Sequence, residues 1–435
     1  MRRSALGRTA KLATLPVGFA ARTTWGVGRR IGGRPAEVVM AEVQQRTADQ
    51  LFRVLGDLKG GAMKFGQAMS IFESALPDEL IGPYREVLTR LQDAAPPMTM
   101  RMLEEVLSED LGPGWRAEFR QFDEDPVAAA SIGQVHRATW TDGTEVAVKI
   151  QYPGAGKALR SDIRQLSRVA RMFTVIAPGI AIRPLLEEIE ARVAEELDYE
   201  LEASAQRVFA AEFDGDPEFA VPHVVHASPR VLVTTWLDTP YSIARVIREG
   251  DQEERDRWAR AYARFLVSGP ARSGLLHADP HPGNFRVMAD GRLGIVDFGA
   301  AARLPDGIPP GLGRLLRDAV DDDWDALAAG LRREGFLLPH TRFETAALRD
   351  YLRPFIEAAR EEEFTFNRQW LRQQAIRVAT PTMENMGNAL KLNLPPEYML
   401  IHRVWVGGIG VLCQLEGTLR FRELLEEFVP GFAET

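Results

Sequence analysis

Three oxygen-bearing side chains suited to phosphate chemistry lie within one short stretch of the chain. Asp279 and Asn284 are five residues apart, and Asp297-Phe298-Gly299 follows them. Asp290-Gly291 separates two short apolar runs between these groups and predicts a two-residue hairpin turn. Carboxylate and amide oxygens at the ends of one loop and one hairpin suit a hard cation such as Mg²⁺. The stretch from His277 to Gly299 therefore predicts a site for metal-assisted phosphoryl transfer.

The same residues admit two other interpretations, a metal-ligand cluster built on His277, Asp279 and His281, or a polar loop without chemistry. The interval from Asp279 to Asn284, however, is that of the protein-kinase catalytic loop H-R-D-x-x-x-x-N. In that loop the Asp accepts the proton of the attacking hydroxyl, while the Asn and the DFG Asp hold magnesium. The spacing therefore favours a kinase-like fold, with Asp279 as catalytic base and Asn284 and Asp297 as metal ligands.

Size and composition are those of a globular protein. The chain has 435 residues, 45% of them hydrophobic and 26% charged, which is enough for two or more domains or lobes. The net charge of -8 gives no reason to expect nucleic acid as a partner. The single cysteine, Cys413, excludes an intrachain disulfide and fits a reducing compartment. We expect no transmembrane helix, because the most apolar run, Val404–Leu412, is short and predicts a buried helix.

The first 34 residues contain eight basic residues and no acidic one. Such a segment could be a transit peptide, a membrane-surface segment or a flexible basic arm. Pro16 and Gly18 interrupt its apolar run and argue against a signal peptide. We expect a solvated arm on a cytoplasmic protein, with peripheral contact to anionic lipid at the inner face of the cell membrane as the alternative.

Residues 35–115 predict an all-helical extension. Apolar residues recur with a helical period until Gly60-Gly61, which ends the first helix. A second helical run, from Ala62 to about Ser74, carries Lys64 and Gln67.

From Phe119 onwards the pattern changes to strands. Two β-prone runs, Val135–Trp140 and Glu145–Ile150, are separated by Thr-Asp-Gly-Thr, which is typical of a hairpin. Lys149 lies on the second run, where a rigid strand would present its charge to the α- and β-phosphates of a nucleotide. A strand lysine is more often solvated, but a small-residue loop just before the hairpin favours phosphate binding. That loop is made of Ala128, Ala129, Ala130 and Ser131.

A carboxylate partner for Lys149 should come from the next helix, but the run from Arg183 to Val208 holds several acids and charge alone does not choose among them. The apolar strand Val231–Leu237 then leads into a segment expected to contact adenine, through Thr235, Trp236 and Leu237. A helix from about Ala244 to Ser268 leads on to the catalytic loop.

Together these motifs resemble those of the UbiB/AarF family of atypical kinase-like proteins. The resemblance keeps the family's order from about residue 50 to residue 305. K-x-G-Q alone is a weak match, whereas the alanine-rich loop and the HADPHPGN sequence are specific. The matching segments are Lys64–Gln67, Pro126–His136, Val146–Gly154, Glu196–Ala203 and His277–Gly299.

The resemblance assigns roles that spacing leaves open. It implies that Glu202 pairs with Lys149, and that Glu196 and Asp198 meet the K-x-G-Q lysine, Lys64, with Gln67 in the same motif. In the family this contact brings the helical extension over the active site and blocks peptide access. The alanine-rich loop also keeps the backbone from approaching the phosphates as closely as glycines would.

The family implies an ATPase or a small-molecule or lipid-directed kinase that uses ATP or ADP with Mg²⁺. Several members support ubiquinone biosynthesis, which makes a lipid or quinone precursor the expected partner. This chain departs from many bacterial members by lacking a C-terminal pair of membrane-spanning helices, so membrane work would depend on surface contact. It also has no Ala-Pro-Glu after Gly299, which agrees with reduced peptide docking.

The sequence thus predicts an α+β, two-lobed protein-kinase-like fold with an N-terminal helical extension packed on the active site. The expected parts are a basic arm (1–34), the helical extension (35–115), an N-lobe (116–237) and a helical C-lobe (238–435). Two alternative functions remain. A small-molecule phosphotransferase shares the loop but lacks K-x-G-Q, and a nucleotide-binding scaffold would be inactive despite a complete site.

Overall fold

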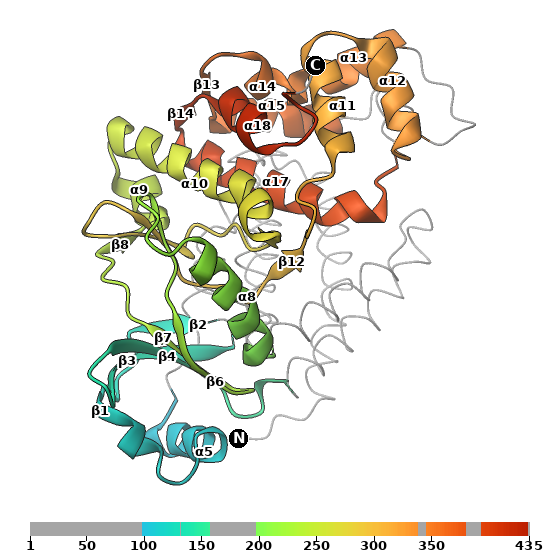
Figure 1. Cartoon of the computed structure of the whole chain (residues 1–435). Helices are drawn as coiled ribbons and strands as arrows, with labels where there is room; N and C mark the ends of the chain where they lie inside the picture. The colour runs from blue at the N-terminus through green and yellow to red at the C-terminus, as the bar shows by residue number, and fades with distance from the viewer. Residues whose placement is uncertain (1–97, 131, 157–196, 338–344, 380–392, 434–435) are drawn as a thin grey trace, which may run out of the picture. The chain divides into compact units, whose positions relative to one another are not determined.

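The computed structural model describes residues 98–130, 132–156, 197–337, 345–379 and 393–433 (Figure 1). The chain forms two compact units. One extends to Leu201 and includes Val224–Trp236, and the other comprises Glu202–His223 and Leu237–Thr435. The boundary between Leu201 and Glu202 falls inside one helix, α8 (Tyr199–Glu212). Most of the predicted helical extension lies outside the described residues.

The first unit is an antiparallel sheet against which helix α5 (Met100–Asp110) packs (Figure 1). The strands run in the order β1-β3-β4-β7-β6, and β2 pairs with β3. A short 3-10 helix, η1 (Trp115–Glu118), links α5 to the sheet. The strand bounds are β1 Phe119–Phe122, β2 Ala128–Ala130, β3 Gly133–Trp140, β4 Glu145–Gln151, β6 Val224–Ala227 and β7 Val231–Thr235.

Alternation along β4 builds the core of this unit. Val146, Val148 and Ile150 are buried, and they pack with apolar residues of α5 spaced for one helix face. The end of α5 is fastened by Asp110, whose carboxylate accepts hydrogen bonds from the backbone N–H and the Nε of Arg230, both at 2.8 Å. The sheet is therefore a rigid support for the side chains on its other face.

Both predicted hairpins with Asp-Gly form, and each loop has three residues, whereas the turn at Asp290-Gly291 was predicted to have two. Trp140 N donates to Thr144 O at 2.8 Å, and Gly143 has a φ of +101°. In the second hairpin, Met288 N donates to Arg292 O at 3.0 Å and Gly291 has a φ of +87°. Glycine takes the left-handed position at the end of the loop, which lengthens the connection by one residue.

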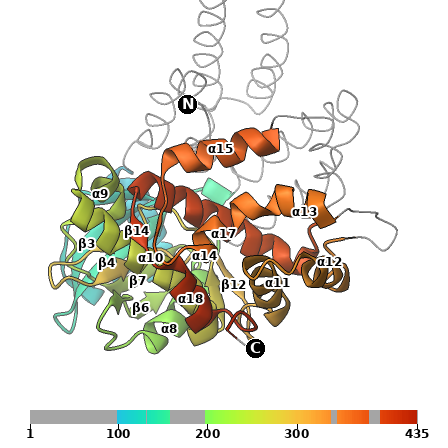
Figure 2. The same ribbon diagram turned by 90° about the horizontal axis from the view of Figure 1, so that it is seen from above.

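The second unit is mostly helical, with its core around α10 (Gln252–Ser273). Figure 2 shows α17 (Pro396–Leu415) and α18 (Phe421–Phe428) beside α10, and both pack against it. The remaining helices are α9 Ile243–Glu249, α11 Pro310–Val320, α12 Trp324–Arg333, α13 Thr345–Leu352, η2 Arg353–Phe355, α14 Glu357–Arg360 and α15 Arg368–Ala379.

The helix predicted from Ala244 to Ser268 is in fact two helices, α9 and α10, separated at Gly250. A Cβ at Gly250 would lie 2.7 Å from the carbonyl oxygen of Val246, so glycine ends α9 without a clash. Asp251 then caps α10 by accepting a hydrogen bond from Glu254 N at 2.9 Å. Gly274, with a φ of +65°, ends α10 directly before the strand that leads into the catalytic loop.

Two of the three small sheets described in this unit lead into the candidate site residues. The largest has the order β5-β11-β10-β8, and a second pairs β9 with β12. The bounds are β5 Phe219–Ala220, β8 Tyr241–Ser242, β9 Leu275–His277, β10 Phe285–Val287, β11 Leu293–Ile295, β12 Ala301–Arg303, β13 Phe364–Thr365 and β14 Thr418–Leu419. The predicted α+β kinase-like class is confirmed.

Among the described residues, only α17 is long and apolar enough to span a bilayer by length and composition. Over half of its most apolar window, 56%, is buried inside the protein, and Val404, Val411 and Leu412 belong to the main core. The predicted buried helix at Val404–Leu412 is therefore observed. Cys413 lies on the same helix, and burial raises the pKa of its thiol.

Candidate active site

The loop between β9 and β10 holds the predicted base and the first predicted metal ligand together. Asp279 is partly exposed, and the side-chain amide of Asn284 donates to the carbonyl oxygen of Asp279 at 3.3 Å. The backbone N–H of Asn284 also donates to His281 O at 3.0 Å. These two bonds fold the loop into a fixed turn, so the carboxylate and the amide keep a constant separation.

The second predicted metal ligand lies next to the first across a hairpin. Strands β10 and β11 pair antiparallel, and Val296 N donates to Asn284 O at 3.0 Å. Asn284 directly precedes β10 and Asp297 is the second residue after β11, so both lie at the same end of the hairpin. No group of three His, Cys, Asp or Glu side chains that could hold a metal occurs in the described part of the chain. A cation here would therefore depend on these two oxygens plus phosphate and water, as Mg²⁺ commonly does.

Glu202 approaches the same position from helix α8. A Cβ on Gly299 would lie 3.2 Å from Asp297 Oδ1 and 3.4 Å from Glu202 Oε2, so both carboxylates flank this glycine. The N–H of Gly299 donates to Asp297 Oδ1 at 2.9 Å. Glu202 is only 4% exposed, and a buried carboxylate near a second one requires compensating cations.

His277 positions the backbone of Asp297, a role that the sequence reasoning missed. Its Nε2 lies 2.7 Å from Asp297 O, and because a carbonyl only accepts, Nε2 carries the proton. Burial lowers the pKa of His277, so the ring is neutral. The rings of Phe209, Phe285 and Phe298 surround it at centroid distances of 6.3, 5.5 and 5.5 Å. Its only sequence signal was its place two residues before Asp279.

Two further side chains hold the catalytic loop from distant helices. Tyr262 on α10 donates its hydroxyl to Pro280 O at 2.6 Å, and Arg403 on α17 donates to Ala278 O at 3.3 Å. Burial raises the pKa of Tyr262, and the negative charge of Asp279 adds to this. The phenol therefore stays protonated and keeps donating.

In the first unit, Lys149 lies on the middle strand of the sheet. It is paired with Val135 on β3 and Leu232 on β7, so its backbone is fixed on both sides. Because its neighbours Val148 and Ile150 point into the core, Lys149 points to the opposite face. Its Nζ lies 5.1 Å from the ring centroid of Tyr199, the first residue of α8.

The alanine-rich segment, predicted as a loop, is strand β2 and pairs with β3. Ala128 pairs with Val135, Ala129 with Gln134 and Ala130 with Gly133, and Ser131 at the tip lies outside the described residues. Gly133 lets β3 lie close to β4, because a Cβ there would lie 2.2 Å from Ile150 O. The need for glycine at position 133 could not be predicted from the sequence, because the contact with Ile150 exists only once β3 and β4 have paired.

The residues predicted to contact adenine follow the end of β7. Trp236 N donates to Glu145 O at 2.8 Å, so this N–H continues the pairing with β4 and serves the sheet. Leu237 is the first residue of the second unit after this crossing, and its Cδ1 lies 3.1 Å from the Cβ position of Gly294 on β11. Thr235 ends β7.

A model of the ABC1 atypical kinase-like domain matches residues 90–330. The chain belongs to this family. Atypical kinase COQ8B of Danio rerio is 28% identical over 96% of this chain and 67% of its own length. Atypical kinase COQ8 of Saccharomyces cerevisiae is 32% identical over 58% of this chain and 50% of its own length. This chain spans between about half and two thirds of these curated relatives. The resemblance to UbiB/AarF proteins is confirmed.

A solved structure of the same kind covers nearly the whole chain. It is described as the complex of Rv3197 with erythromycin from Mycobacterium tuberculosis. It is 41% identical, has a TM-score of 0.71, and the match covers 92% of this chain and all of that one.

Of the acidic pair that the family resemblance assigns to a contact with Lys64, only Asp198 is described. Its carboxylate accepts hydrogen bonds from the N–H groups of Glu200 and Leu201, at 3.0 and 3.1 Å, which is the geometry of an N-cap for α8. Lys64, Gln67 and Glu196 lie outside the described residues. Asp198 therefore has a structural role at the start of the helix that carries Glu202.

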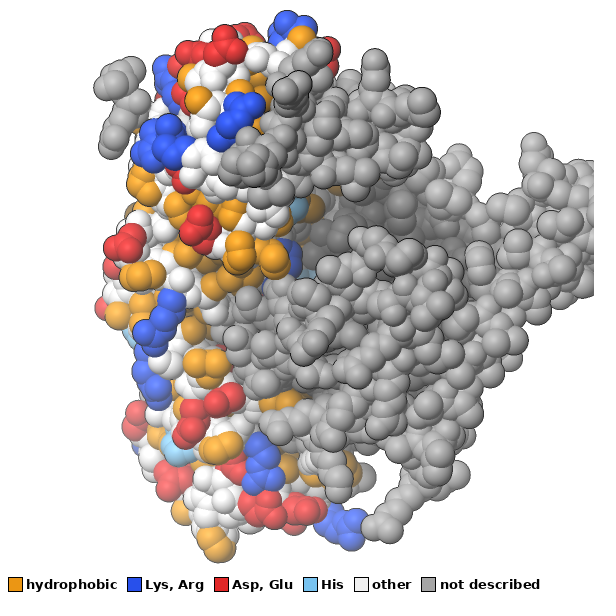
Figure 3. All heavy atoms as spheres, turned by 90° about the vertical axis from the view of Figure 1, so that its right-hand side faces the viewer, with side chains coloured by type: hydrophobic (Ala, Val, Ile, Leu, Met, Phe, Trp, Pro, Cys, Tyr) orange, Lys and Arg blue, Asp and Glu red, His pale blue; other side chains and the backbone are white. Residues whose placement is uncertain are grey.

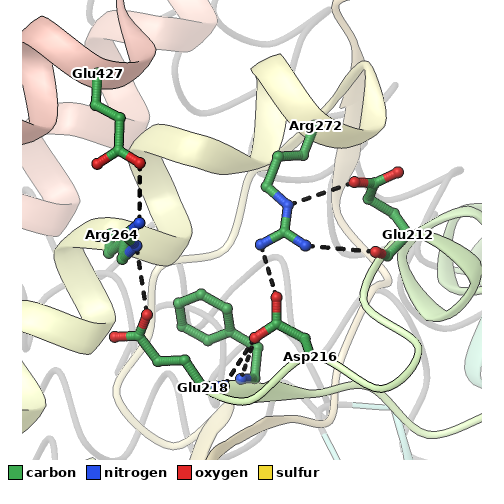
Figure 4. A network of polar contacts seen from close by, with 7 residues as sticks. Glu212, Asp216, Glu218, Arg264, Arg272 and Glu427 are labelled. Carbon is green, nitrogen blue, oxygen red and sulfur yellow. Dashed lines mark hydrogen bonds and ion pairs between the residues drawn. The ribbon is translucent and has the colours of Figure 1, made fainter.

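The other end of α8 is fastened by the network in Figure 4. Arg272 on α10 contacts the Glu212 carboxylate at 3.4 Å, the Glu212 carbonyl at 3.4 Å and Asp216 at 2.8 Å. Its guanidinium also lies 3.9 Å from the ring centroid of Phe213. Burial opposes ionisation of Asp216, but two backbone hydrogen bonds and Arg272 outweigh it and lower its pKa. Arg272 thus donates to a carbonyl at the C-terminal end of α8 and forms ion pairs with the two carboxylates there.

A second arginine in the same network links three elements. Arg264 on α10 contacts Glu218 at 3.4 Å and Glu427 on α18 at 2.9 Å (Figure 4). Burial raises the pKa of Glu218.

The surface in Figure 3 has no continuous basic area among its described residues. On this face, Lys and Arg side chains alternate with Asp and Glu, and hydrophobic side chains lie between them.

Proposed function

We propose that this ABC1-family chain is an ATP- and Mg²⁺-dependent atypical kinase or ATPase that transfers the γ-phosphoryl group to a small or lipid-like acceptor or to water. The observation that supports this most is the position of Asn284 and Asp297 at the same end of the β10–β11 hairpin, with Asp279 fixed on the same loop as Asn284. These are the three oxygen-bearing groups that such a reaction needs.

In the proposed reaction, Asp279 accepts the proton of the attacking hydroxyl as its oxygen bonds to the γ-phosphorus and the bond to the β-phosphate oxygen breaks. ADP leaves with the electron pair of that bond. The partial exposure of Asp279 allows an acceptor to reach it.

Asn284 and Asp297 would hold Mg²⁺ against the phosphates. The ion would neutralise the charge that develops on the phosphate oxygens. His277 and Gly299 support this role, since they fix the Asp297 backbone and carboxylate respectively.

Lys149 and Glu202 would form the ion pair that orders the α- and β-phosphates. Lys149 is held on the middle of a sheet, and Glu202 is nearly buried beside Asp297. We further propose that the segment with Lys64 and Gln67 restricts access for peptides, which directs the site toward lipids or quinone precursors, with peripheral membrane contact.

The test is ATP turnover by the purified chain with Mg²⁺. Wild-type protein should hydrolyse ATP, and Asp297→Asn should lower the rate at least about 100-fold, since it removes the charge that holds the metal. Asp290→Asn, on the exposed turn of the same hairpin, is the matched control and should keep the wild-type rate. Equal rates for wild type and Asp297→Asn would exclude the proposed chemistry. Vesicles containing anionic lipid should raise the wild-type rate if the acceptor or activator is a lipid.

A second candidate acceptor class is a macrolide, because the relative that is 41% identical was solved with erythromycin. Thermal shift with erythromycin tests binding, and mass spectrometry after incubation with Mg-ATP tests phosphorylation. Binding without a mass increase would make the macrolide a ligand only.

A further inference from the structure

Arg286 on strand β10 is a half-buried cation that has no acidic partner among the described residues. Its Nε donates to the hydroxyl of Thr239 at 3.2 Å, and its Nη2 lies 3.5 Å from the Thr239 carbonyl oxygen. Within the described residues, these two contacts with Thr239 are the hydrogen bonds of the Arg286 side chain. A guanidinium withdrawn from water and paired only with neutral oxygens is costly, so its retention calls for a ligand.

The face on which Arg286 lies is the one that carries the candidate metal ligand. Phe285 and Val287, its neighbours on β10, are 0% and 4% exposed and pack into the core. Side chains alternate along a strand, so Arg286 and Asn284 point to the other face. Across the ladder, Arg286 pairs with Gly294, and Val296 on the same face is 40% exposed. This face is therefore open, and Asn284 and Arg286 are about 7 Å apart along it.

Arg286 lies away from the end of the hairpin where the phosphates are proposed to bind. Asp297 and Asn284 mark the position of the metal and the phosphates at one end of the hairpin. At the other end, Leu237 packs on Gly294, directly across the ladder from Arg286, and Thr239 holds the guanidinium. Leu237 is a residue predicted to contact the base. A nucleotide with its phosphates at Asn284 would place its nucleoside part over Arg286.

The missing side chain of Gly294 lets Leu237 and Met288 pack closely on the strand opposite Arg286. Gly294 leaves the ladder position opposite Arg286 without a Cβ, and Leu237 Cδ1 and Met288 Cγ lie 3.1 and 3.5 Å from where that atom would be. The guanidinium, held by Thr239, presents a flat surface of fixed position. Flat cations of this kind stack on aromatic rings.

We propose that Arg286 is a nucleotide-recognition residue whose guanidinium stacks against the base of the bound nucleotide. This rests on the proposed function, because it needs a nucleotide whose phosphates lie at Asn284 and Asp297. Stacking energy grows with the size of the ring system, so Arg286 favours purine over pyrimidine nucleotides.

The experiment measures the affinity of the full chain for Mg-ATP, Mg-CTP and Mg-tripolyphosphate by calorimetry, in wild type and Arg286→Met. Methionine keeps the length and loses the charge and the plane. ATP affinity should fall about 2- to 30-fold, as expected for loss of a cation–π contact. CTP affinity should fall less, and tripolyphosphate, which has no base, should bind equally to both proteins. Arg292→Met, on the same hairpin and paired with Asp290, is the control and should leave all three affinities unchanged.

A thermal melt of the ligand-free variant separates binding from folding. Removing an uncompensated half-buried cation should leave the midpoint unchanged or raise it. Thr239→Val, which removes the hydroxyl that holds the guanidinium, should lower ATP affinity by a smaller factor than Arg286→Met. Equal ATP affinity of wild type and Arg286→Met, or an equal loss for tripolyphosphate, would overturn this inference and leave the proposed function standing. Absence of ATP binding by the wild type would instead overturn the proposed function.

Discussion

His277 combines two properties that depend on each other. It is buried among aromatic rings, which keeps it neutral, and it donates from Nε2 to the backbone of Asp297. Its Nδ1 is buried and has no hydrogen-bond partner among the described residues. A proton added at Nδ1 would therefore meet neither water nor an acceptor, so protonation opposes the native arrangement.

This predicts an acid-sensitive site. The folded pKa of His277 lies below its ordinary value of 6.5, so the folded state binds this proton less readily than the unfolded chain. The free energy of unfolding should be constant above pH 6.5 with respect to this group and fall as the pH drops below it. His277→Gln keeps an N–H donor and removes the titration, which should flatten the dependence between pH 5.5 and 7.

Urea unfolding at several pH values measures the effect. His136 is a suitable comparison, because burial also lowers its pKa and it belongs to the first unit. His136→Gln should flatten the same pH range by its own share, because the pKa of both imidazoles is lowered from the same ordinary value. If His277→Gln retains the full wild-type slope, the imidazole is not the acid-sensitive group.

The chemistry-bearing residues could be predicted because they lie close in sequence. Asp279, Asn284 and Asp297 occupy one loop and one hairpin, so their spacing alone brings them together. Tyr262 and Arg403 could not be predicted, because they reach the loop from α10 and α17 and depend on helix packing. Arg286 escaped notice for a different reason, since an arginine on a polar-looking strand is ordinarily solvated.

At the scale of elements, helix α8 is held at both ends by polar contacts. Asp198 caps its start, and Arg272 pairs with its last residue and with Asp216 beyond it. Between them, Phe209 packs 5.1 Å from Phe298 and 5.9 Å from Phe265, measured between ring centroids. The helix that carries Glu202 is therefore part of the packed core of the second unit.

Arg272→Met tests this anchoring. The side chain of Asp216 is only 10% exposed and would lose its cation, so we expect a loss of about 1–3 kcal/mol in the free energy of unfolding. Amides near the C-terminal end of α8 should exchange hydrogen faster. Arg245→Met removes an exposed pair with Glu249 and should cost much less stability than Arg272→Met, because solvent screens that pair. Similar losses for both variants in denaturant unfolding would show that Arg272 is not an anchor.

The elements themselves were predictable to different degrees. β-prone runs and Asp-Gly signals gave the positions of the β3–β4 and β10–β11 hairpins correctly. The two-residue turn predicted at Asp290-Gly291 was wrong, because Gly291 takes the last of three loop positions. The break at Gly250 was missed, since its cause is a close contact with Val246 that a helical period does not reveal.

At the scale of the whole molecule, the family resemblance links the N-terminal extension to α8 through Lys64 and the acids before the helix. Asp198 accepts two backbone hydrogen bonds, which leaves its charge able to act on a cation as well. A contact with Lys64 would then couple any movement of the extension to the N-terminal end of α8, the helix that carries Glu202.

Asp198→Asn separates the two roles, because asparagine caps helices as well as aspartate but carries no charge. If Lys64 pairs with Asp198, then Asp198→Asn and Lys64→Ala should each change ATP turnover about 3- to 10-fold in the same direction. The double variant should show no further change. Asp198→Ala should in addition lower stability by about 1 kcal/mol through loss of the cap. Unchanged turnover in Asp198→Asn alongside a changed rate in Lys64→Ala would exclude this pairing.

The buried position of Cys413 has a practical consequence for measurements in solution. It is the only cysteine of the chain, it is 0% exposed, and the thiolate that reacts with maleimides is disfavoured there. The natural protein should therefore behave as cysteine-free toward labelling reagents. A cysteine introduced at an exposed position such as Ala129 would carry a dye or a spin label at one defined place, without any other substitution.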